Sequence, residues 1–391
     1  MKNQFRILLL MLITSTIVYA QKASEIEMDE KHTIYKENFT TNHNTTLVLN
    51  LNNTSAQVME SPDDKVYVEY TKEFKNTRKK RIQDQLKLLI VSGKKEDNKI
   101  TYSSKGRNDI HDRLYSFEEL MINRSEKNKF LKDSLRKPVE RKSLDSVLHE
   151  IKASDSIYRN KLLGALKIKP RVKKWKKSDQ IIITKMVVKI PRNIHVRATL
   201  ENSNLVFMDD FYNRATMNVR NSKLRFKSIG NSLNIFDFDN GYFNAEVVSG
   251  GSYSFANAKE VRIGRLRNSL LTTEFTKIEI GKIGSKNKII DFNSKFIFHN
   301  FSKDFKVLEM NTEYSEISMF FNKSMDYELK TLGNNTRHYI ENKLFDYKLY
   351  KKNMKPIMLD VLNKTSETLN NIITINTTNG IIRISEDVIK F

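Results

Sequence analysis

The chain has 391 residues, a formal net charge of +22 and no cysteine. The lack of cysteine excludes disulfide bonds, thiolate metal sites, a cysteine nucleophile and a lipid-modified N-terminal cysteine. The positive charge favours anionic partners, and a basic surface that serves only solubility is the alternative interpretation.

The N-terminus has the features of a secretory signal peptide. Lys2 and Arg6 form a positive n-region, and the apolar stretch 7–18 follows them. Val18-Tyr19-Ala20 then suits cleavage before Gln21. The apolar stretch is shorter than the about 20 residues of a spanning helix, which argues against a retained anchor. We therefore expect a signal peptide over residues 1–20 and an exported protein in the periplasm or at the cell surface, associated with the outer membrane.

The first part of the mature chain predicts a β region. Residues 21–38 are polar and are expected to form a flexible N-terminal segment. From Leu47 to Leu51 apolar and polar residues alternate, which is the period of a half-buried strand. Residues 86–91 and 100–103 flank a polar run and predict a hairpin. The N-terminal β region is therefore expected over residues 39–106.

Beyond Gly106 the spacing of the apolar residues becomes helical. Leu144, Leu148 and Ile151 fall at i, i+4 and i+7, which places them on one face of a helix. Prolines lie on both sides of this pattern. We therefore expect a basic α-helical insertion over residues 107–178, between two β regions.

A dense cluster of positive charge lies at the end of this insertion, around the only tryptophan of the chain. Cations beside an aromatic ring suit a bilayer interface or a phosphate-bearing polymer. The alternative is a solvated linker, which is what runs of charge usually are. The candidate residues for binding an anionic surface are Lys167, Lys169, Arg171, Lys173, Lys174, Trp175, Lys176 and Lys177.

The stretch from Ile190 to Phe321 is a succession of short strands separated by turn residues. Asn202-Ser203-Asn204-Leu205-Val206-Phe207 is matched 19 positions later by Asn221-Ser222-Lys223-Leu224-Arg225-Phe226. Another 19 positions later comes Asn240-Gly241-Tyr242-Phe243. A coil with turns of this length buries its inward side chains only when the turns stack. The match therefore predicts stacked columns of leucine and phenylalanine, with asparagine at the turns that need a positive φ.

These patterns predict a mainly β fold, a β-solenoid or β-helix-like stack of short strands with an α-helical insertion. An antiparallel β-sandwich is the alternative, because the strand lengths alone permit it. The repeat region is expected over residues 179–324 and a C-terminal β region over 325–391. A closing hairpin is predicted at Asn379-Gly380, because both central residues of a type I′ turn need a positive φ.

Two stretches resemble a known family. Ile190-Pro191-Arg192-Asn193 and residues 375–384 are similar to the bacterial putative-adhesin family, also called the auto-transporter adhesin head GIN domain. The likeness covers residues 39–104 and 181–384. It implies a β-rich, solenoid-like domain of unknown function on an exported Gram-negative protein. The turns here use asparagine where the family uses glycine, and the insertion is foreign to its compact members. The family has no agreed catalytic residues to transfer.

Motifs for catalysis or metal binding remain incomplete in this sequence. The seven histidines show no zincin spacing. The S-x-x-K motif at Ser134 has no K-T-G partner, and Asp237 and Asp239 miss the ligand positions of an EF-hand. We therefore expect no enzyme activity, with no catalytic, cofactor-binding or metal-binding residues and no cofactor.

The sequence thus predicts an adhesin-like cell-envelope protein that offers a non-catalytic surface for interaction or structural support. The alternatives are a polysaccharide-active β-helix enzyme and an envelope-stress signalling partner. The expected partners are an anionic polysaccharide, lipid headgroups or another envelope protein. We expect no specific recognition of nucleic acid, and no transmembrane helix after signal cleavage.

Overall fold

The structure is a computed structural model of the chain, and it describes residues 27–106, 181–321, 327–340, 346–350, 357–362 and 371–386. The predicted signal peptide and the predicted insertion with its basic cluster lie outside the described residues. The described part is mainly β, as the sequence predicts. Its elements are β1 (Glu27–Thr40), β2 (Thr46–Asn52), β3 (Ser55–Glu60), β4 (Lys65–Arg78), α2 (Lys79–Lys87), β5 (Ile90–Glu96), β6 (Lys99–Lys105), β7 (Ile181–Ile190), β8 (His195–Glu201), β9 (Asn204–Phe207), β10 (Ala215–Gly230), β11 (Ile235–Ser249), β12 (Ser252–Ala256), β13 (Glu260–Arg267), β14 (Ser269–Glu274), β15 (Lys277–Phe292), β16 (Lys295–Phe298), β17 (Phe301–Glu313), β18 (Glu316–Phe321), β19 (Glu328–Asn334), β20 (Arg337–Ile340), β21 (Asp346–Tyr350), β22 (Ile357–Leu362), β23 (Ile372–Thr378) and β24 (Ile381–Glu386).

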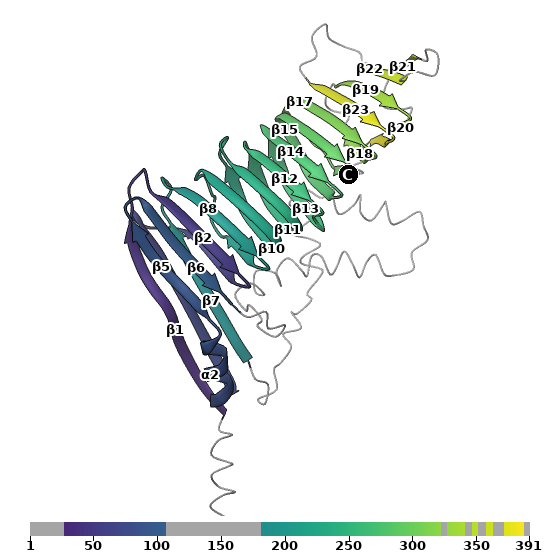
Figure 1. Cartoon of the computed structure of the whole chain (residues 1–391). Helices are drawn as coiled ribbons and strands as arrows, with labels where there is room; N and C mark the ends of the chain where they lie inside the picture. The colour runs from purple at the N-terminus through teal and green to yellow at the C-terminus, as the bar shows by residue number, and fades with distance from the viewer. Residues whose placement is uncertain are drawn as a thin grey trace, which may run out of the picture.

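Most strands belong to two parallel ladders that run along the long axis of the molecule (Figure 1). The first ladder has the order β6, β2, β8, β10, β11, β12, β14, β15, β17, β23 and β19. The second has the order β7, β3, β9, β10, β11, β13, β15, β16, β18, β24 and β20. Each turn of the chain gives one strand to each ladder, and we call such a turn a rung.

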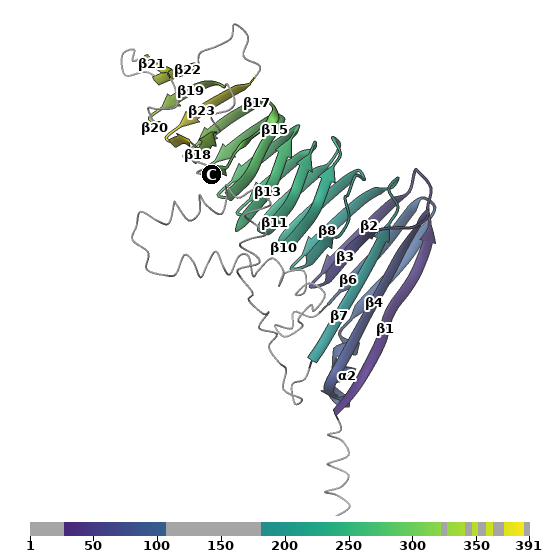
Figure 2. The same ribbon diagram turned by 180° about the vertical axis from the view of Figure 1, so that it is seen from behind.

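Antiparallel strands extend both ends of this stack. At the N-terminal end, β5 pairs with β6. On the other side β4 pairs with β7 and β1 pairs with β4, as the view from behind in Figure 2 shows. At the C-terminal end, β22 pairs with β19, and β21 pairs with β22. These pairings satisfy backbone groups that the outermost strands of a parallel stack would otherwise leave open.

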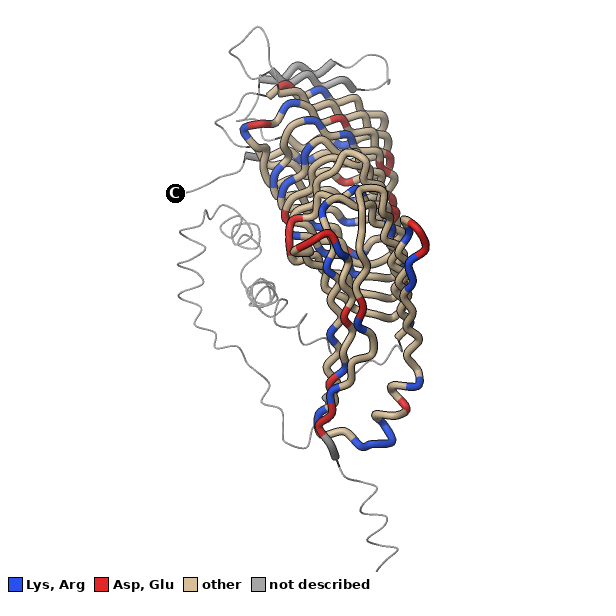
Figure 3. Tube along the Cα trace, turned by 90° about the vertical axis from the view of Figure 1, so that its left-hand side faces the viewer, with Lys and Arg blue, Asp and Glu red and all other residues tan. Residues whose placement is uncertain are grey.

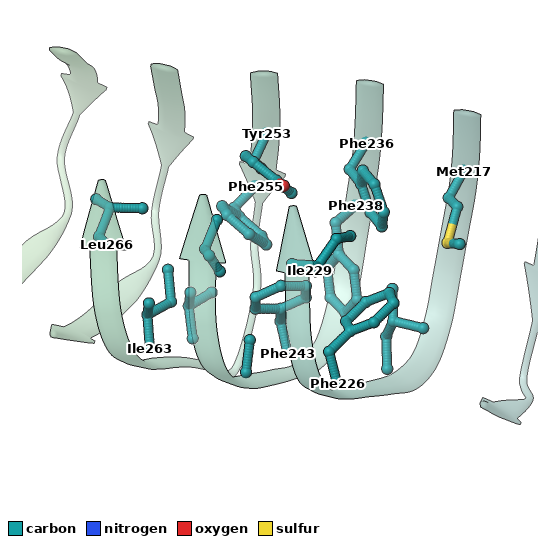
Figure 4. Packing of buried hydrophobic residues seen from close by; sticks show 14 of the residues in the cluster. Met217, Phe226, Ile229, Phe236, Phe238, Phe243, Tyr253, Phe255, Ile263 and Leu266 are labelled. Atoms are coloured by element: carbon teal, nitrogen blue, oxygen red, sulfur yellow. The ribbon is translucent and has the colours of Figure 1, made fainter. Parts of the chain in front are cut away.

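The core lies between the two ladders and is a set of stacked columns (Figure 4). Leu205 pairs with Leu224, as the 19-residue match predicts. The rings of Phe207 and Phe226 stack with their centroids 4.3 Å apart, and all four side chains are buried. Figure 4 shows the same inward direction for Phe226, Phe243 and their neighbours. The predicted leucine and phenylalanine columns are therefore confirmed.

A sharp corner joins the first-ladder strand of each rung to its second-ladder strand. Asn202, Asn221 and Asn240 occupy this corner with φ values of 49°, 50° and 53°. The amide of Asn240 donates a hydrogen bond to the side-chain oxygen of Asn221, 2.6 Å away. Behind the corner, the N–H of Ser203 donates to the hydroxyl of Ser222 at 2.9 Å. The predicted positive φ at these asparagines is confirmed, and the structure adds a side-chain bond between two of them on neighbouring rungs.

The closing hairpin predicted at Asn379-Gly380 is wrong. β23 pairs in parallel with β17 and β19, and β24 pairs in parallel with β18 and β20. Of the two turn residues, only Asn379 has a positive φ, 54°. A corner between parallel ladders needs a single left-handed residue, whereas a type I′ turn needs two. The Asn-Gly pair suits either turn, so the local sequence does not distinguish a corner between ladders from a hairpin.

Two boundaries also differ from the expectation. Part of the segment 21–38 is the strand β1, because its backbone pairs along β4 and because Ile34 and Tyr35 pack against the core. Residues 86 and 87 lie in helix α2, which buries Ile82, and the hairpin strand begins only at Ile90. Among the described residues no helix has the length and hydrophobicity needed to cross a bilayer.

Candidate interaction surfaces

Six cations gather where the second-ladder strands end and the chain turns back toward the next rung. The strands β13, β15 and β17 supply them from neighbouring rungs. We call this set the basic edge, and its members are Arg265, Arg267, Lys282, Lys286, Lys303 and Lys306. Figure 3 shows that Lys and Arg, in blue, recur on successive turns on the outside of the stack.

The register of the ladder fixes the positions in the basic edge. Arg265 of β13 lies directly opposite Lys282 of β15. Neighbouring strands lie about 4.8 Å apart, so the two backbones hold the two cations close together. The main chain beside Lys303 is also anchored, because Phe301 of β17 pairs with Ile283 of β15. The like charges therefore arise from stacking and not from a run in the sequence.

One carboxylate, Asp304, lies within the basic edge. A hydrogen bond from the Ser302 hydroxyl lowers the pKa of the Asp304 carboxyl, and the nearby charges of Arg265 and Arg267 lower it further. Asp304 is therefore ionised at neutral pH and offsets one of the six positive charges. Within the part of the chain that the structure describes, no carboxylate comes within 4.0 Å of a basic-edge cation to form an ion pair. The edge keeps a surplus of positive charge.

The outer face of the second ladder has a different charge pattern. There Glu279 accepts a hydrogen bond from His299 at 2.7 Å and also lies 3.7 Å from Arg262. Lys295 pairs with Glu316 at 3.0 Å, across neighbouring strands. Charges on this face largely neutralise each other, as cross-strand pairs of opposite sign do. An external anion would meet unpaired cations at the basic edge and not on this face.

A small pocket lies beside Pro191, and charged groups in its lining are paired within it or with nearby Lys227. Arg192 pairs with Glu60 at 2.7 Å, and the N–H of Glu60 donates to Asp209 at 2.8 Å. Asp210 lies 3.4 Å from Lys227. Its volume of about 20 Å³ has room for about one water molecule, whereas ligand pockets usually hold roughly 300–1,000 Å³. These carboxylates therefore serve the structure of the rung.

The described residues contain no group of three or more His, Cys, Asp or Glu side chains placed to bind a metal ion. The basic cluster predicted over residues 167–177 lies outside the described residues. Sequence reasoning missed the basic edge, because its cations are scattered over some 40 positions. Arg265 and Lys282 are 17 positions apart, close to the length of one rung, and that spacing is the signal that would have found them.

No family model matches the chain, and no curated protein matches it. Among the solved structures, one match is a crystal structure of a putative cell adhesion protein from Clostridium sporogenes. It is 10% identical, with a TM-score of 0.17, and the alignment covers 92% of this chain and 100% of that chain. Membership of the adhesin family stays a prediction.

Proposed function

We propose that this protein is an exported, non-catalytic cell-envelope protein of adhesin-like type, and that its basic edge binds an acidic polysaccharide. The observation that carries the proposal is the set of six cations on neighbouring rungs, facing a single carboxylate. A polymer with repeated negative charges can meet several of these cations at once. Exposed charge pairs contribute only about 0.2–1 kcal/mol each, so a row of them is needed for measurable affinity.

The proposed architecture is a β-solenoid. The parallel pairing of successive rungs in both ladders favours it over an antiparallel sandwich. The strongest repeat, at 19 residues, matches the pairing of Leu205 with Leu224. A solenoid places equivalent residues of successive rungs in rows on its outside, which is how scattered cations become a continuous surface. This arrangement supports a binding role spread along the molecule.

The proposal is tested by binding of the mature chain, residues 21–391, to polygalacturonate, with dextran as the uncharged comparison. We expect binding to polygalacturonate that weakens steeply with added salt, because exposed charges are screened beyond about 8 Å at physiological ionic strength. Arg265→Glu with Lys282→Glu should weaken it by about tenfold or more. The matched control is Lys31→Glu with Lys36→Glu on β1, which makes the same change of charge at the far end of the molecule.

Retained binding by the edge variant, or equal loss in the control, would overturn the assignment of the edge. Binding confined to vesicles of anionic lipid would replace the polysaccharide by a membrane. Release of unsaturated products from polygalacturonate would favour the enzyme alternative and end the proposal of a non-catalytic surface. Circular dichroism of each variant shows whether the fold is retained.

A further inference from the structure

The corner residues of the stack form one column, in which eight residues are asparagine and two are aromatic. Backbone bonds connect successive corners, as where the N–H of Phe275 donates to the carbonyl of Phe292 and that of Asn293 to Glu313. Each residue of the column has a positive φ. In stacking order they are Asn53, Asn202, Asn221, Asn240, Asn257, Phe275, Asn293, Tyr314, Asn379 and Asn335.

Phe275 and Tyr314 hold φ values of 46° and 55°. The left-handed region costs roughly 1–2 kcal/mol for residues with a Cβ, and asparagine reduces this through its short polar side chain. An aromatic ring has no such compensation. Burial of the rings does not offset this conformational free energy either, since Phe275 is 49% exposed and Tyr314 is 52% exposed. Neither backbone geometry nor the core explains why these two corners are aromatic.

A third exposed ring connects the two. Phe292, which is 38% exposed, lies one residue before the corner of the intervening rung. Its centroid is 5.5 Å from that of Phe275 and 5.8 Å from that of Tyr314, and both contacts are edge to face. The three rings therefore form a continuous strip over three rungs, about 10 Å along the stack at the usual strand spacing. We call this strip the aromatic corner.

The surroundings of the aromatic corner are polar and nearly balanced in charge. Glu274 and Glu313 lie on the strands on either side of Phe292, directly opposite it. Lys277, exposed like the two carboxylates, follows Phe275 by two residues. An aromatic ring packs well on the C–H face of a sugar, while carboxylates accept and an ammonium donates hydrogen bonds to its hydroxyls. An anionic polymer would be repelled by the carboxylates flanking the central ring.

From this geometry we infer that the aromatic corner is a second binding site, for a neutral polysaccharide, distinct from the basic edge. Along β15 the two surfaces are separated by the strand from Lys277 to Lys282, about 17 Å at 3.3 Å per residue. The strip has the length of a short oligosaccharide lying along the stack. Its rings supply contact area, and the flanking charged groups fix the orientation of the sugar.

The test uses the mature chain and four neutral hexasaccharides, derived from cellulose, starch amylose, laminarin and chitin, in titration calorimetry. We expect binding of at least one. Phe275→Asn with Tyr314→Asn should weaken that binding by about tenfold or more. The same variant should unfold at an unchanged or higher temperature, because asparagine suits the left-handed corner better than an aromatic residue. Loss of binding without loss of stability would separate a ligand site from a structural one.

The matched control is Tyr212→Asn, which removes a half-exposed ring outside the strip. It should leave binding of the hexasaccharide within about twofold of the parent. Equal loss in this control, retained binding by the double variant, or no binding of any of the four sugars would overturn the inference. Capture of an envelope protein through these rings, with no sugar bound, would also overturn it. Polygalacturonate binding should be the same in parent and variant, so failure here is distinct from failure of the proposed function.

Discussion

The side chain of Phe226 lies where the rings of several rungs meet. It stacks on Phe207 at 4.3 Å and contacts Phe236 and Phe243 at centroid distances of 5.8 Å and 6.0 Å. It is fully buried, while Lys223 in the same strand points outward over the ring of Tyr242. Residues only three positions apart in one strand thus have very different energetic roles, because inward and outward side chains alternate along it.

We therefore expect Phe226→Ala to lower the free energy of unfolding by about 3–5 kcal/mol, the usual loss for a buried aromatic ring. Lys223→Ala should lower it by no more than about 1 kcal/mol, the contribution of an exposed cation over a ring. Urea unfolding followed by circular dichroism measures both values. Equal losses for the two variants would show that the register of β10 is not the one described.

At the scale of strands and corners, the local sequence predicted the features that repeat from one rung to the next. It did not predict which strands pair when they are far apart in the sequence. The 19-residue match was enough to place Leu205 on Leu224 and Asn221 at a corner. It was not enough to find the partners of β23 and β24, because Asn379-Gly380 is the same kind of turn in a hairpin and in a coil. The basic edge escaped for a related reason: Arg265 and Lys282 meet only through pairing between rungs. The strand β1 was missed because its sequence is polar and it forms a strand only by pairing with β4.

Cross-linking can distinguish the two arrangements of β23. Asn311 and Asn376 are direct partners, with 3.0 Å between their side-chain amide nitrogen and oxygen. Because the chain has no cysteine, Asn311→Cys with Asn376→Cys should give a single disulfide on oxidation, seen as a mobility shift without reductant. Paired strands suit the Cα separation of about 4.4–6.8 Å that a disulfide needs.

The control pair is Asn376→Cys with Arg383→Cys, which would face each other across an Asn-Gly hairpin. In the structure these residues lie on different ladders and should not cross-link. A disulfide in the control, with none in the first pair, would restore the hairpin and contradict the parallel placement of β23 between β17 and β19.

At the scale of the whole molecule, the end of β6 and the start of β7 lie near the same corner of the stack. Gly106 follows β6, and its N–H donates to the carbonyl of Asn52, beside the corner of the first rung. β7 starts at Ile181 and reaches the level of that corner, Asn53, about two residues later, judged from the pairing of Val187 with Gln57. At 3.3 Å per residue this offset is about 7 Å. A short linker can span it.

We therefore expect that replacing residues 107–180 with a Gly/Ser linker of about 12 residues leaves a cooperatively folded β protein, since loop closure depends only weakly on length. Thermal unfolding by circular dichroism should show one transition at a temperature close to that of the parent. Loss of the β signal would instead mean that the segment is part of the fold. If residues 167–177 bind anions, the same variant should also lose affinity for polyphosphate, which charge reversal of Lys173, Lys174, Lys176 and Lys177 should reproduce.

The placement of β23 and β24 has a consequence for how the protein is made. β19 and β20 precede them in the chain but lie beyond them in the stack. The strands that cover β17 and β18 are thus supplied by the last described residues, 372–386. A growing chain cannot complete this end of the stack before residues 372–386 have been made. Until then β17 and β18 present unpaired strand edges, which expose the nascent protein to aggregation and make it a target for chaperones.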